Sequence, residues 1–528
     1  MMRRAICFLL TLVLLAGMAS AAFTDESKIT ADFTAAVAYM SEKGVIGGFP
    51  DGSFKPKDTL TRAQAAKIIC TVLEGADKVD AISATANFSD VSADHWAAKF
   101  VGYCADKGIV SGVGNNKFNP NGQLTGAAFA KMLLVAYGAD GSKFTGENWV
   151  ISVQKALREA KMNYKVGATE EPMQREQACQ MAYNFMRTEE LKNVTGYQEV
   201  TVKPTAQNVK LLGRAEATAN GVLLNFPADG IEFTTDCVGE IKVQYASDAA
   251  HYVTAFVDGK ETDQRAGVQQ TSVGTASVYR FIEPGAHTIR IVQDSEVNTS
   301  GKRITIQGVV LQAKSGEVKP TAQKKHYIEF VGASTVAGCG TLGDTKTAWS
   351  AAVHAGTKSF AYFTAENLDV DYSIVAKGGI GFIKKSGGVT YTPMYMLQNA
   401  WADSSREAPF SRIPDIVVYA RGGNDKATEE EYYAAMKEFL IEARKKTGPD
   451  TLFVVTHNAS TKEKTFRAYA EERLLADLGG EAKGYYAVEL PGDFNGVIAT
   501  GASTPHPNAA DNVKAAAVLT DYLKTLLK

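Results

Sequence analysis

The segment IEFVGASTVAGCG, residues 328–340, joins a β-prone run to a cluster of small residues. Ile328 to Val331 predict a strand that ends at Gly332, and Ser334 follows two residues later. A strand that ends at a glycine and then presents a serine is one way to expose a nucleophile. Taken alone, the pattern fits a hydroxyl in an ordinary turn better, because Gly and Ser are common loop residues. The role of Ser334 therefore depends on what accompanies it.

The chain from 324 to 528 alternates strand-like and helix-like segments. Runs such as DIVVYARG and TLFVVTH are typical of buried strands, and EEEYYAAMKEFLIEARKKTG is typical of a helix. This alternation predicts a parallel sheet with helices on both faces. In such sheets the chemistry takes place in loops that follow the carboxyl ends of the strands.

Three further loops of this block carry candidate site residues. Asn424, in RGGND, follows a hydrophobic strand, where its amide can donate to a developing oxyanion. Gly378, Gly379 and Gly381 follow another strand, and a glycine can present its backbone N–H without a side chain in the way. His506 lies between two prolines before the C-terminal helix, a rigid position suited to a general base. The other histidines lie in repeat, strand or less informative positions: His95, His251, His287, His326, His354 and His457.

In the order Ser, Gly, Asn, His, these loops resemble the motifs of SGNH hydrolases, which have an α/β/α three-layer fold with a flavodoxin-like parallel sheet. The resemblance implies that Ser334 is the nucleophile and His506 the general base. It also implies that Asn424 and a backbone N–H of Gly379 or Gly381 are oxyanion donors. No metal or organic cofactor is implied.

The sequence departs from this family pattern at its acidic positions. Ala333 stands where the usual GDS motif has Asp, and Ser503 stands where an Asp usually precedes the histidine; Thr504 is no acid either. The resemblance then implies a Ser/His dyad in which a backbone carbonyl orients His506, as family 2 esterases are known to use. Because a triad carboxylate is usually worth orders of magnitude in rate, a weak enzyme or a binding relic is the alternative.

Residues 200–315 have a different texture from the last block. Short β-branched and aromatic runs are separated by Gly, Asp, Asn and Pro, which predicts an antiparallel β-sandwich. The expected short strands include GIEFTTDC, GEIKVQYA, SVYRFI and HTIRIV. The stretches LLGRA (211–215) and PGAHTIRIV (284–292) resemble the N-terminal jelly-roll domain of carbohydrate esterase family 2. The alternative is a generic sandwich of unrelated origin.

Residues 42–75 and 106–138 repeat one another. Matching positions such as Gly44 and Gly108 are 64 residues apart, and a fixed period over many positions indicates a duplicated unit. In each copy a Thr precedes an apolar-periodic segment, where it can cap the helix.

These repeats resemble S-layer homology repeats, most closely in FSDVSADHWAAKFVGYCADKGIVSG and LTRAQAA. A third, eroded copy runs from about NWVISVQKALREA to MQREQACQMAYNFM. The family implies a mostly α bundle over residues 23–190 that holds exported proteins to pyruvylated cell-wall polysaccharide.

In that family the Arg of the TRAE-like motif meets the acidic ligand, a role that suits the fixed donor fork of a guanidinium. Only Arg62 and Arg175 carry this role over, because the second copy has Gly126 at the position. The alternative for Arg62 is a solvated residue in the first turn of a helix.

The chain begins with the pattern of a secretory signal peptide over residues 1–22. Arg3 and Arg4 precede an apolar run and the small residues ASAA, so the mature protein is expected outside the cell. The five cysteines that then remain are scattered singly, which argues against a zinc ribbon and a disulfide-dense scaffold. We interpret them mainly as small buried hydrophobes, with a Cys70–Cys104 disulfide as an alternative.

A length of 528 residues predicts about three domains after the signal peptide: 23–190, 200–315 and 324–528. The net charge of -2 offers no global attraction to nucleic acid or an anionic membrane.

Together these features predict an exported esterase that removes O-acetyl groups from plant cell-wall polysaccharide, xylan or mannan, while attached to the wall or S-layer of its producer. Its expected partners are the acetylated polysaccharide and a secondary cell-wall polymer. Trp349 and Trp401 are candidates for sugar stacking, with core packing as the alternative. The competing hypothesis is a non-catalytic surface protein that binds glycan through a degenerate hydrolase domain.

Overall fold

The computed structural model divides into two compact units, Met1–Asn193 and Val194–Lys528. The residues it describes are 23–160, 162–262, 265–296, 303–343, 348, 350–383, 390–399, 403–408, 410, 412–420, 424–425, 428–458, 473–491 and 506–527. The predicted signal peptide, Trp349, Trp401, Ser503 and Thr504 lie outside these residues.

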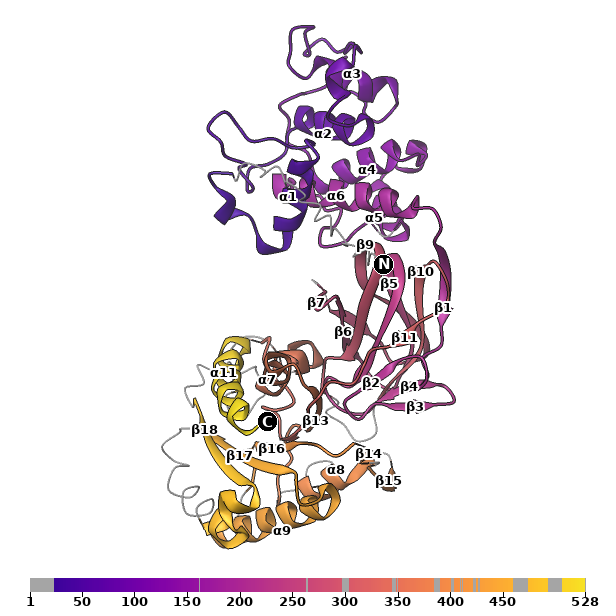
Figure 1. The fold of residues 1–528 in the computed structure, drawn as a ribbon. Coiled ribbons are helices and arrows are strands. Elements are labelled where there is room, and N and C mark those ends of the chain that lie inside the picture. Colours follow the sequence, from indigo (N-terminus) through magenta and orange to yellow (C-terminus); the bar gives the residue numbers. More distant parts are fainter. Residues whose placement is uncertain are drawn as a thin grey trace, which may run out of the picture. The chain divides into compact units, whose positions relative to one another are not determined.

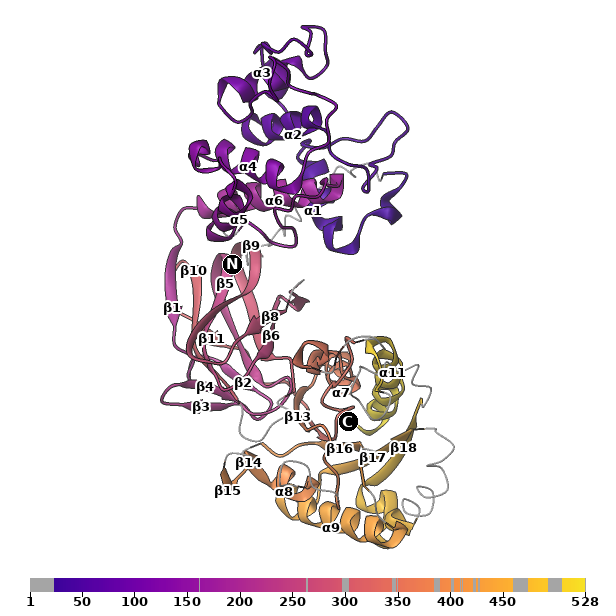
Figure 2. The same ribbon diagram turned by 180° about the vertical axis from the view of Figure 1, so that it is seen from behind.

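The first unit is built from helices (Figures 1 and 2). They are α1 (Thr34–Glu42), α2 (Arg62–Glu74), α3 (Ala98–Asp106), α4 (Gly126–Ala136), α5 (Trp149–Glu159) and α6 (Arg175–Lys192). The side chain of Thr61 accepts the Gln64 N–H in a capping box at the start of α2. Thr125 caps α4 in the same way through the Ala128 N–H. Capping satisfies backbone donors that a helix start otherwise leaves free.

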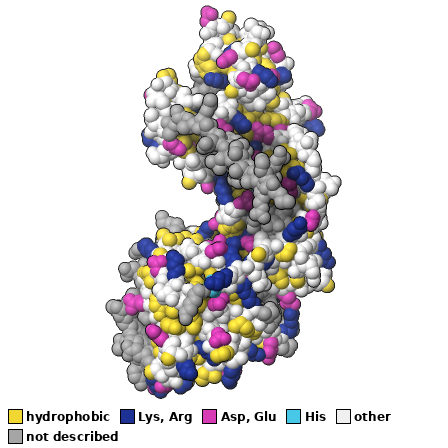
Figure 3. Space-filling view, in the orientation of Figure 1, with side chains coloured by type: hydrophobic (Ala, Val, Ile, Leu, Met, Phe, Trp, Pro, Cys, Tyr) yellow, Lys and Arg dark blue, Asp and Glu magenta, His cyan; other side chains and the backbone are white. Residues whose placement is uncertain are grey.

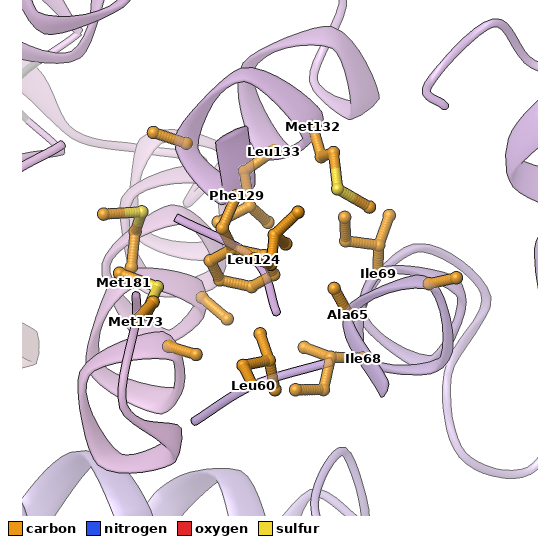
Figure 4. Close-up of a cluster of buried hydrophobic side chains, with 14 of the residues drawn as sticks. Leu60, Ala65, Ile68, Ile69, Leu124, Phe129, Met132, Leu133, Met173 and Met181 are labelled. Atoms are coloured by element: carbon orange, nitrogen blue, oxygen red, sulfur yellow. The ribbon is translucent and has the colours of Figure 1, made fainter. Parts of the chain in front are cut away.

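Three backbone segments form a closed ring at the centre of this unit. The Leu60 N–H donates to Met173 O at 2.8 Å, the Leu124 N–H to Leu60 O at 2.9 Å, and the Met173 N–H to Leu124 O at 2.8 Å. Each residue directly precedes the capping residue of α2, α4 or α6. All three side chains are buried in one apolar core (Figure 4). The eroded third copy therefore occupies a position equivalent to those of the other two.

The second unit begins with an antiparallel sheet of eleven strands. They are β1 (Gln198–Val202), β2 (Lys210–Leu212), β3 (Glu216–Thr218), β4 (Gly221–Leu224), β5 (Gly230–Ser247), β6 (His251–Val257), β7 (Lys260–Glu261), β8 (Ala266–Val268), β9 (Thr271–Gln293), β10 (Ile304–Ala313) and β11 (Lys319–Pro320).

Two of these strands are longer than the sequence pattern indicates. GIEFTTDC and GEIKVQYA, expected as separate strands, are joined in β5, and SVYRFI and HTIRIV are joined in β9. The β5–β9 ladder shifts register at Gly239, whose φ is +83°. A bulge of this kind bends a strand without ending it. Gly239, which the sequence pattern suggests as a turn between two strands, therefore marks a bulge within one strand.

The unit ends with a five-stranded parallel sheet in the order β13-β12-β16-β17-β18. These strands are β12 (Tyr327–Gly332), β13 (Asp371–Ala376), β16 (Ile416–Ala420), β17 (Leu452–Asn458) and β18 (Tyr485–Leu490). Counted along the chain, the order is 2-1-3-4-5, which is that of flavodoxin-like folds. A two-stranded antiparallel sheet, β14 (Leu397–Asn399) and β15 (Asp403–Glu407), is separate from it.

Helices cover both faces of the parallel sheet (Figures 1 and 2). They are α7 (Phe360–Leu368), α8 (Tyr391–Met396), α9 (Glu429–Thr447) and α11 (Ala509–Leu526). Alternate residues of β12 face opposite sides: Phe330 packs in the core beneath α7 and α11, and Val331 in the core beneath α8 and α9. Residues of the antiparallel sheet, such as Phe256, join the first of these cores.

Charged side chains of both signs are interspersed over the described residues of the second unit on the face seen in Figure 3. No helix among the described residues has the length and apolar character needed to cross a membrane.

Candidate functional site

Ser334 lies just beyond the carboxyl end of β12. Gly332 ends that strand in a crowded place, because a Cβ there would lie 2.3 Å from Val336 Cγ2 and 2.8 Å from Ala420 O. The chain then turns tightly, with the Ala337 N–H donating to Ala333 O at 3.0 Å. The turn leaves Ser334 partly exposed while Ala333 is buried. Ala333 thus contributes a small apolar side chain to the core, where the usual SGNH motif has an acid.

His506, near the C-terminal end of the chain, lies next to Ser334. Its Nε2 lies 2.8 Å from Ser334 Oγ. With the ring protonated on Nδ1, Nε2 accepts the serine proton, which is the arrangement a general base requires.

The start of α11 is fixed against the segment that follows Ser334. The Ala509 N–H donates to Thr341 O at 3.2 Å, and Asn508 caps the helix through the Asp511 N–H. Asn512 accepts the Phe360 N–H at 2.9 Å, which ties α11 to α7. These contacts fix the segment that directly follows His506.

The glycine loop after β13 and the Asn424 loop after β16 contact each other. Asn424 Nδ2 donates to Ile380 O at 3.0 Å. Gly379 has a φ of +74°, which favours glycine, and a Cβ at Gly381 would lie 2.4 Å from Asp425 Oδ1. An amide carries two N–H groups, so Asn424 can be held by Ile380 through one and donate to a ligand through the other.

Two buried residues near Ser334 carry no sequence signal of a role in the site. His354 Nδ1 accepts the Gly340 N–H at 3.0 Å. Burial, together with the nearby charges of His506 and Arg265, lowers the pKa of His354 to about 4. His354 is therefore neutral at neutral pH and acts as a hydrogen-bond acceptor. The second residue, Glu296, comes from the antiparallel sheet and is considered below.

The first unit contains two equivalent grooves. Groove A, with a cavity of about 300 Å³, is lined by residues that include Arg62, Lys131 and Trp149. Groove B, about 220 Å³, is lined by residues that include Arg175, Lys67 and Trp96. Each lysine is the sixth residue of its helix, so the two sites are related by the repeat. Each groove combines two cations with an indole ring.

The arginines of both grooves are held by aromatic rings and carbonyl groups. Arg62 Nε donates to Phe118 O at 2.8 Å, and its guanidinium lies 4.5 Å from the centre of that ring. Arg175 Nε donates to Phe54 O at 2.9 Å and stacks similarly. Arg62 is half-buried, and a second nitrogen of its guanidinium donates to Ser111 O at 2.8 Å.

The third equivalent position lacks both cations. Gly126 replaces the arginine, and a Cβ there would lie 3.0 Å from Thr169 N and 3.3 Å from Gly167 O. Gln180 takes the place of the lysine on α6 and donates to Asn184 instead. The third interface therefore serves packing rather than presenting positive charge.

The cysteines are buried as thiols, and Cys70 Sγ lies 3.6 Å from Cys104 Sγ. Among the described residues, no group of three or more His, Cys, Asp and Glu side chains could hold a metal ion.

Comparison with known proteins finds different relatives for the N-terminal residues and for the second unit. The S-layer homology domain model matches residues 22–66 and 87–130, so the chain carries S-layer homology domains. The Surface-layer 125 kDa protein of Lysinibacillus sphaericus is 38% identical over 125 residues. That match covers 24% of this chain and only 10% of the relative.

The second unit has the fold of family 2 carbohydrate esterases. A family two carbohydrate esterase from Clostridium thermocellum, solved with cellohexaose, is similar with a TM-score of 0.53 and 20% identity, covering 60% of this chain and 98% of that one. An acetyl xylan esterase from Butyrivibrio proteoclasticus has a TM-score of 0.53 and 18% identity, covering 62% and 98%. Both predicted resemblances, at the N-terminus and beyond it, are confirmed.

Proposed function

We propose that the chain is a wall-attached carbohydrate esterase that removes acetyl groups from plant cell-wall polysaccharide, with acetylated xylan or mannan as substrate. The observation that carries this proposal is the 2.8 Å hydrogen bond between His506 Nε2 and Ser334 Oγ at the carboxyl end of a parallel sheet. The fold likeness to carbohydrate esterases supports the choice of an acetylated sugar.

The reaction proceeds in two half-steps. Ser334 Oγ attacks the acetyl carbonyl carbon while His506 Nε2 takes the hydroxyl proton. The tetrahedral oxyanion accepts hydrogen bonds from the Asn424 amide and from the backbone N–H of Gly379 or Gly381. The intermediate collapses, His506 returns the proton to the sugar oxygen, and the sugar alcohol leaves an acetyl-serine. In the second half-step a water molecule attacks the acetyl-serine carbonyl while His506 takes its proton. The proton then passes to Ser334 Oγ as acetate leaves.

The missing acids affect what orients the His506 ring. They do not prevent His506 from lying at hydrogen-bond distance from Ser334. Ser334 and His506 meet at hydrogen-bond distance although Ala333 is apolar. We therefore propose a dyad in which a backbone carbonyl orients the ring.

The test is acetate release from acetylated xylan, acetylated mannan and a chromogenic acetate ester. Ser334→Ala should abolish release, and Thr335→Ala, which removes the neighbouring hydroxyl of the same turn, should not. Release by Ser334→Ala at the wild-type rate would refute the proposal. A wild-type protein that binds these glycans without releasing acetate would support the non-catalytic alternative.

We also propose that grooves A and B hold an anionic polymer of the cell wall. Support comes from the paired cations of each groove and from the S-layer homology match. An indole face beside two cations suits a charged sugar, because it offers apolar contact next to charge. Through these grooves the protein would be attached to the cell surface.

Sedimentation of the protein with purified wall sacculi tests the attachment. Replacement of both groove arginines by alanine should release the protein into the supernatant. Arg158→Ala, at an exposed position of α5, is the matched control. Equal sedimentation with walls stripped of their secondary polymer would refute the proposal.

A further inference from the structure

Glu296 follows the longest strand of the antiparallel sheet but contacts the catalytic loops. Its side chain is buried, with 3% of the residue exposed. Oε2 accepts the thiol proton of Cys339 at 3.0 Å, and Oε1 accepts the Gly378 N–H. The Cys339 N–H in turn donates to Ser334 O at 2.9 Å. One carboxyl group thus connects the turn that carries the nucleophile with the loop that carries the candidate oxyanion donors.

The contact with Gly378 agrees with the choice of oxyanion donor. The Gly378 N–H donates to Glu296, which is compatible with Gly379 or Gly381 as the proposed donor. A Cβ at Gly378 would lie 3.0 and 3.1 Å from the two carboxyl oxygens. Glycine at 378 therefore permits the close approach of Glu296.

The charges around Glu296 suit a fixed acceptor. Burial raises its pKa, while the Cys339 thiol, the Gly378 N–H and the Lys377 ammonium act against that rise. Burial and the nearby carboxyl group raise the pKa of Cys339 well above its ordinary value, so the thiol keeps its proton and can donate. Lys377 is itself buried beside this cluster.

We propose that Glu296 is a positioning residue, which holds the glycine loop at a fixed distance from Ser334 so that the oxyanion donor is in place before the reaction. This inference rests on the proposed esterase function. It gives the antiparallel domain a part in holding the two loops of the proposed site.

The first test compares Glu296→Ala, Glu296→Gln and Glu329→Gln in the full chain. Loss of one oxyanion donor costs about 10²–10³ in kcat, so a displaced donor in Glu296→Ala should lower kcat about 30-fold while KM changes less than about twofold. Glu296→Gln keeps an acceptor for the Gly378 N–H and should recover most of that loss.

Glu329→Gln is the matched control for a buried carboxyl. Glu329 is equally buried and lies in the first half of β12, away from Ser334. It accepts hydrogen bonds from Tyr327, Tyr395 and Arg214. The control should keep the wild-type kcat. Equal kcat losses in Glu329→Gln and Glu296→Ala, or an unchanged kcat in Glu296→Ala, would overturn the proposal.

Hydrogen–deuterium exchange separates this inference from the proposed function. Glu296→Ala should raise backbone amide exchange at least about tenfold in both 334–343 and 376–383. The substitution removes the buried hydrogen bonds by which Glu296 holds each segment. Glu329→Gln should leave both unchanged. Wild-type protein that releases no acetate refutes the esterase function, and exchange then decides alone whether Glu296 holds the two loops. Unchanged exchange in both segments of Glu296→Ala would overturn the positioning role.

Discussion

The two units of the chain assemble their functional groups in opposite ways. In the first, one pattern of residues is repeated around the ring of Leu60, Leu124 and Met173, and two copies of a cationic groove result. In the second, each group of the site occurs once and comes from a different loop. With repeated sites one interface can lack its cations, as the interface with Gly126 and Gln180 does. A site in which each group occurs once has no second copy to compensate for a loss. One substitution should therefore abolish activity in the second unit but only weaken binding in the first.

The largest effect should come from Ser334→Ala and His506→Ala. Because neither half of a dyad works without the other, each should lower the rate of acetate release by about 10⁴-fold or more, and the double variant should be no worse than either. Steady-state kinetics with a chromogenic acetate ester measures this. Additive losses in the double variant would show that the two residues do not act as one unit.

The grooves should respond in graded steps. Each of Arg62→Ala and Arg175→Ala should weaken binding to wall sacculi about tenfold, as expected for loss of charged hydrogen bonds, and the double variant should lose binding. Sedimentation over a range of wall concentrations gives the affinities. If either single variant abolished binding, the grooves would not be redundant and the contrast between the units would fail.

Asn424→Ala tests a group that supports the dyad without belonging to it. Removal of one oxyanion donor should lower kcat about 100-fold and leave KM nearly unchanged. Asn424→Asp keeps the size and removes the donor, so it should be equally impaired. A rise in KM at constant kcat would assign Asn424 to substrate binding instead.

Acid should destabilise the second unit through His354. The pKa of this histidine is about 4 in the folded protein against an ordinary value of 6.5, so the unfolded chain binds the extra proton between these values. Stability should therefore fall as the pH drops from about 6.5 to about 4, by on the order of 3 kcal/mol. Urea unfolding at several pH values should show a flatter dependence in His354→Gln. Identical curves for the two proteins would contradict the assignment.

The smallest effect should follow from Ser503→Asp. If a backbone carbonyl already orients His506, a new carboxylate should change kcat less than about twofold. A gain of tenfold or more would show that the site is a triad that has lost its acid. The same assay serves for this variant, with Thr504→Asp as a control for added charge in the same loop.

Local patterns in the sequence were enough to predict the repeats and the strand ends, because both depend on spacing within a short stretch. The meeting of Ser334 with His506 was implied by the resemblance to SGNH hydrolases rather than by local pattern. The continuous strands β5 and β9 were not predictable, because a glycine at a bulge has the same local signal as one in a turn. Glu296 and His354 were missed for another reason: their positions depend on tertiary contacts between distant segments, and nothing near them in the sequence marks such a contact.

The closed ring at the centre of the first unit also sets the number of its repeats. An open stack of repeats can grow or shorten at its ends, because each member contacts only its neighbours. In this ring the N–H and carbonyl groups of Leu60, Leu124 and Met173 are all hydrogen-bonded to one another. A fourth repeat would find no free backbone group there, and the loss of one repeat would break the ring. The backbone ring therefore holds all three repeats in place although the interface with Gly126 and Gln180 lacks the groove cations. The third repeat therefore has two parts to play: Met173 closes the ring, and Arg175 lines groove B.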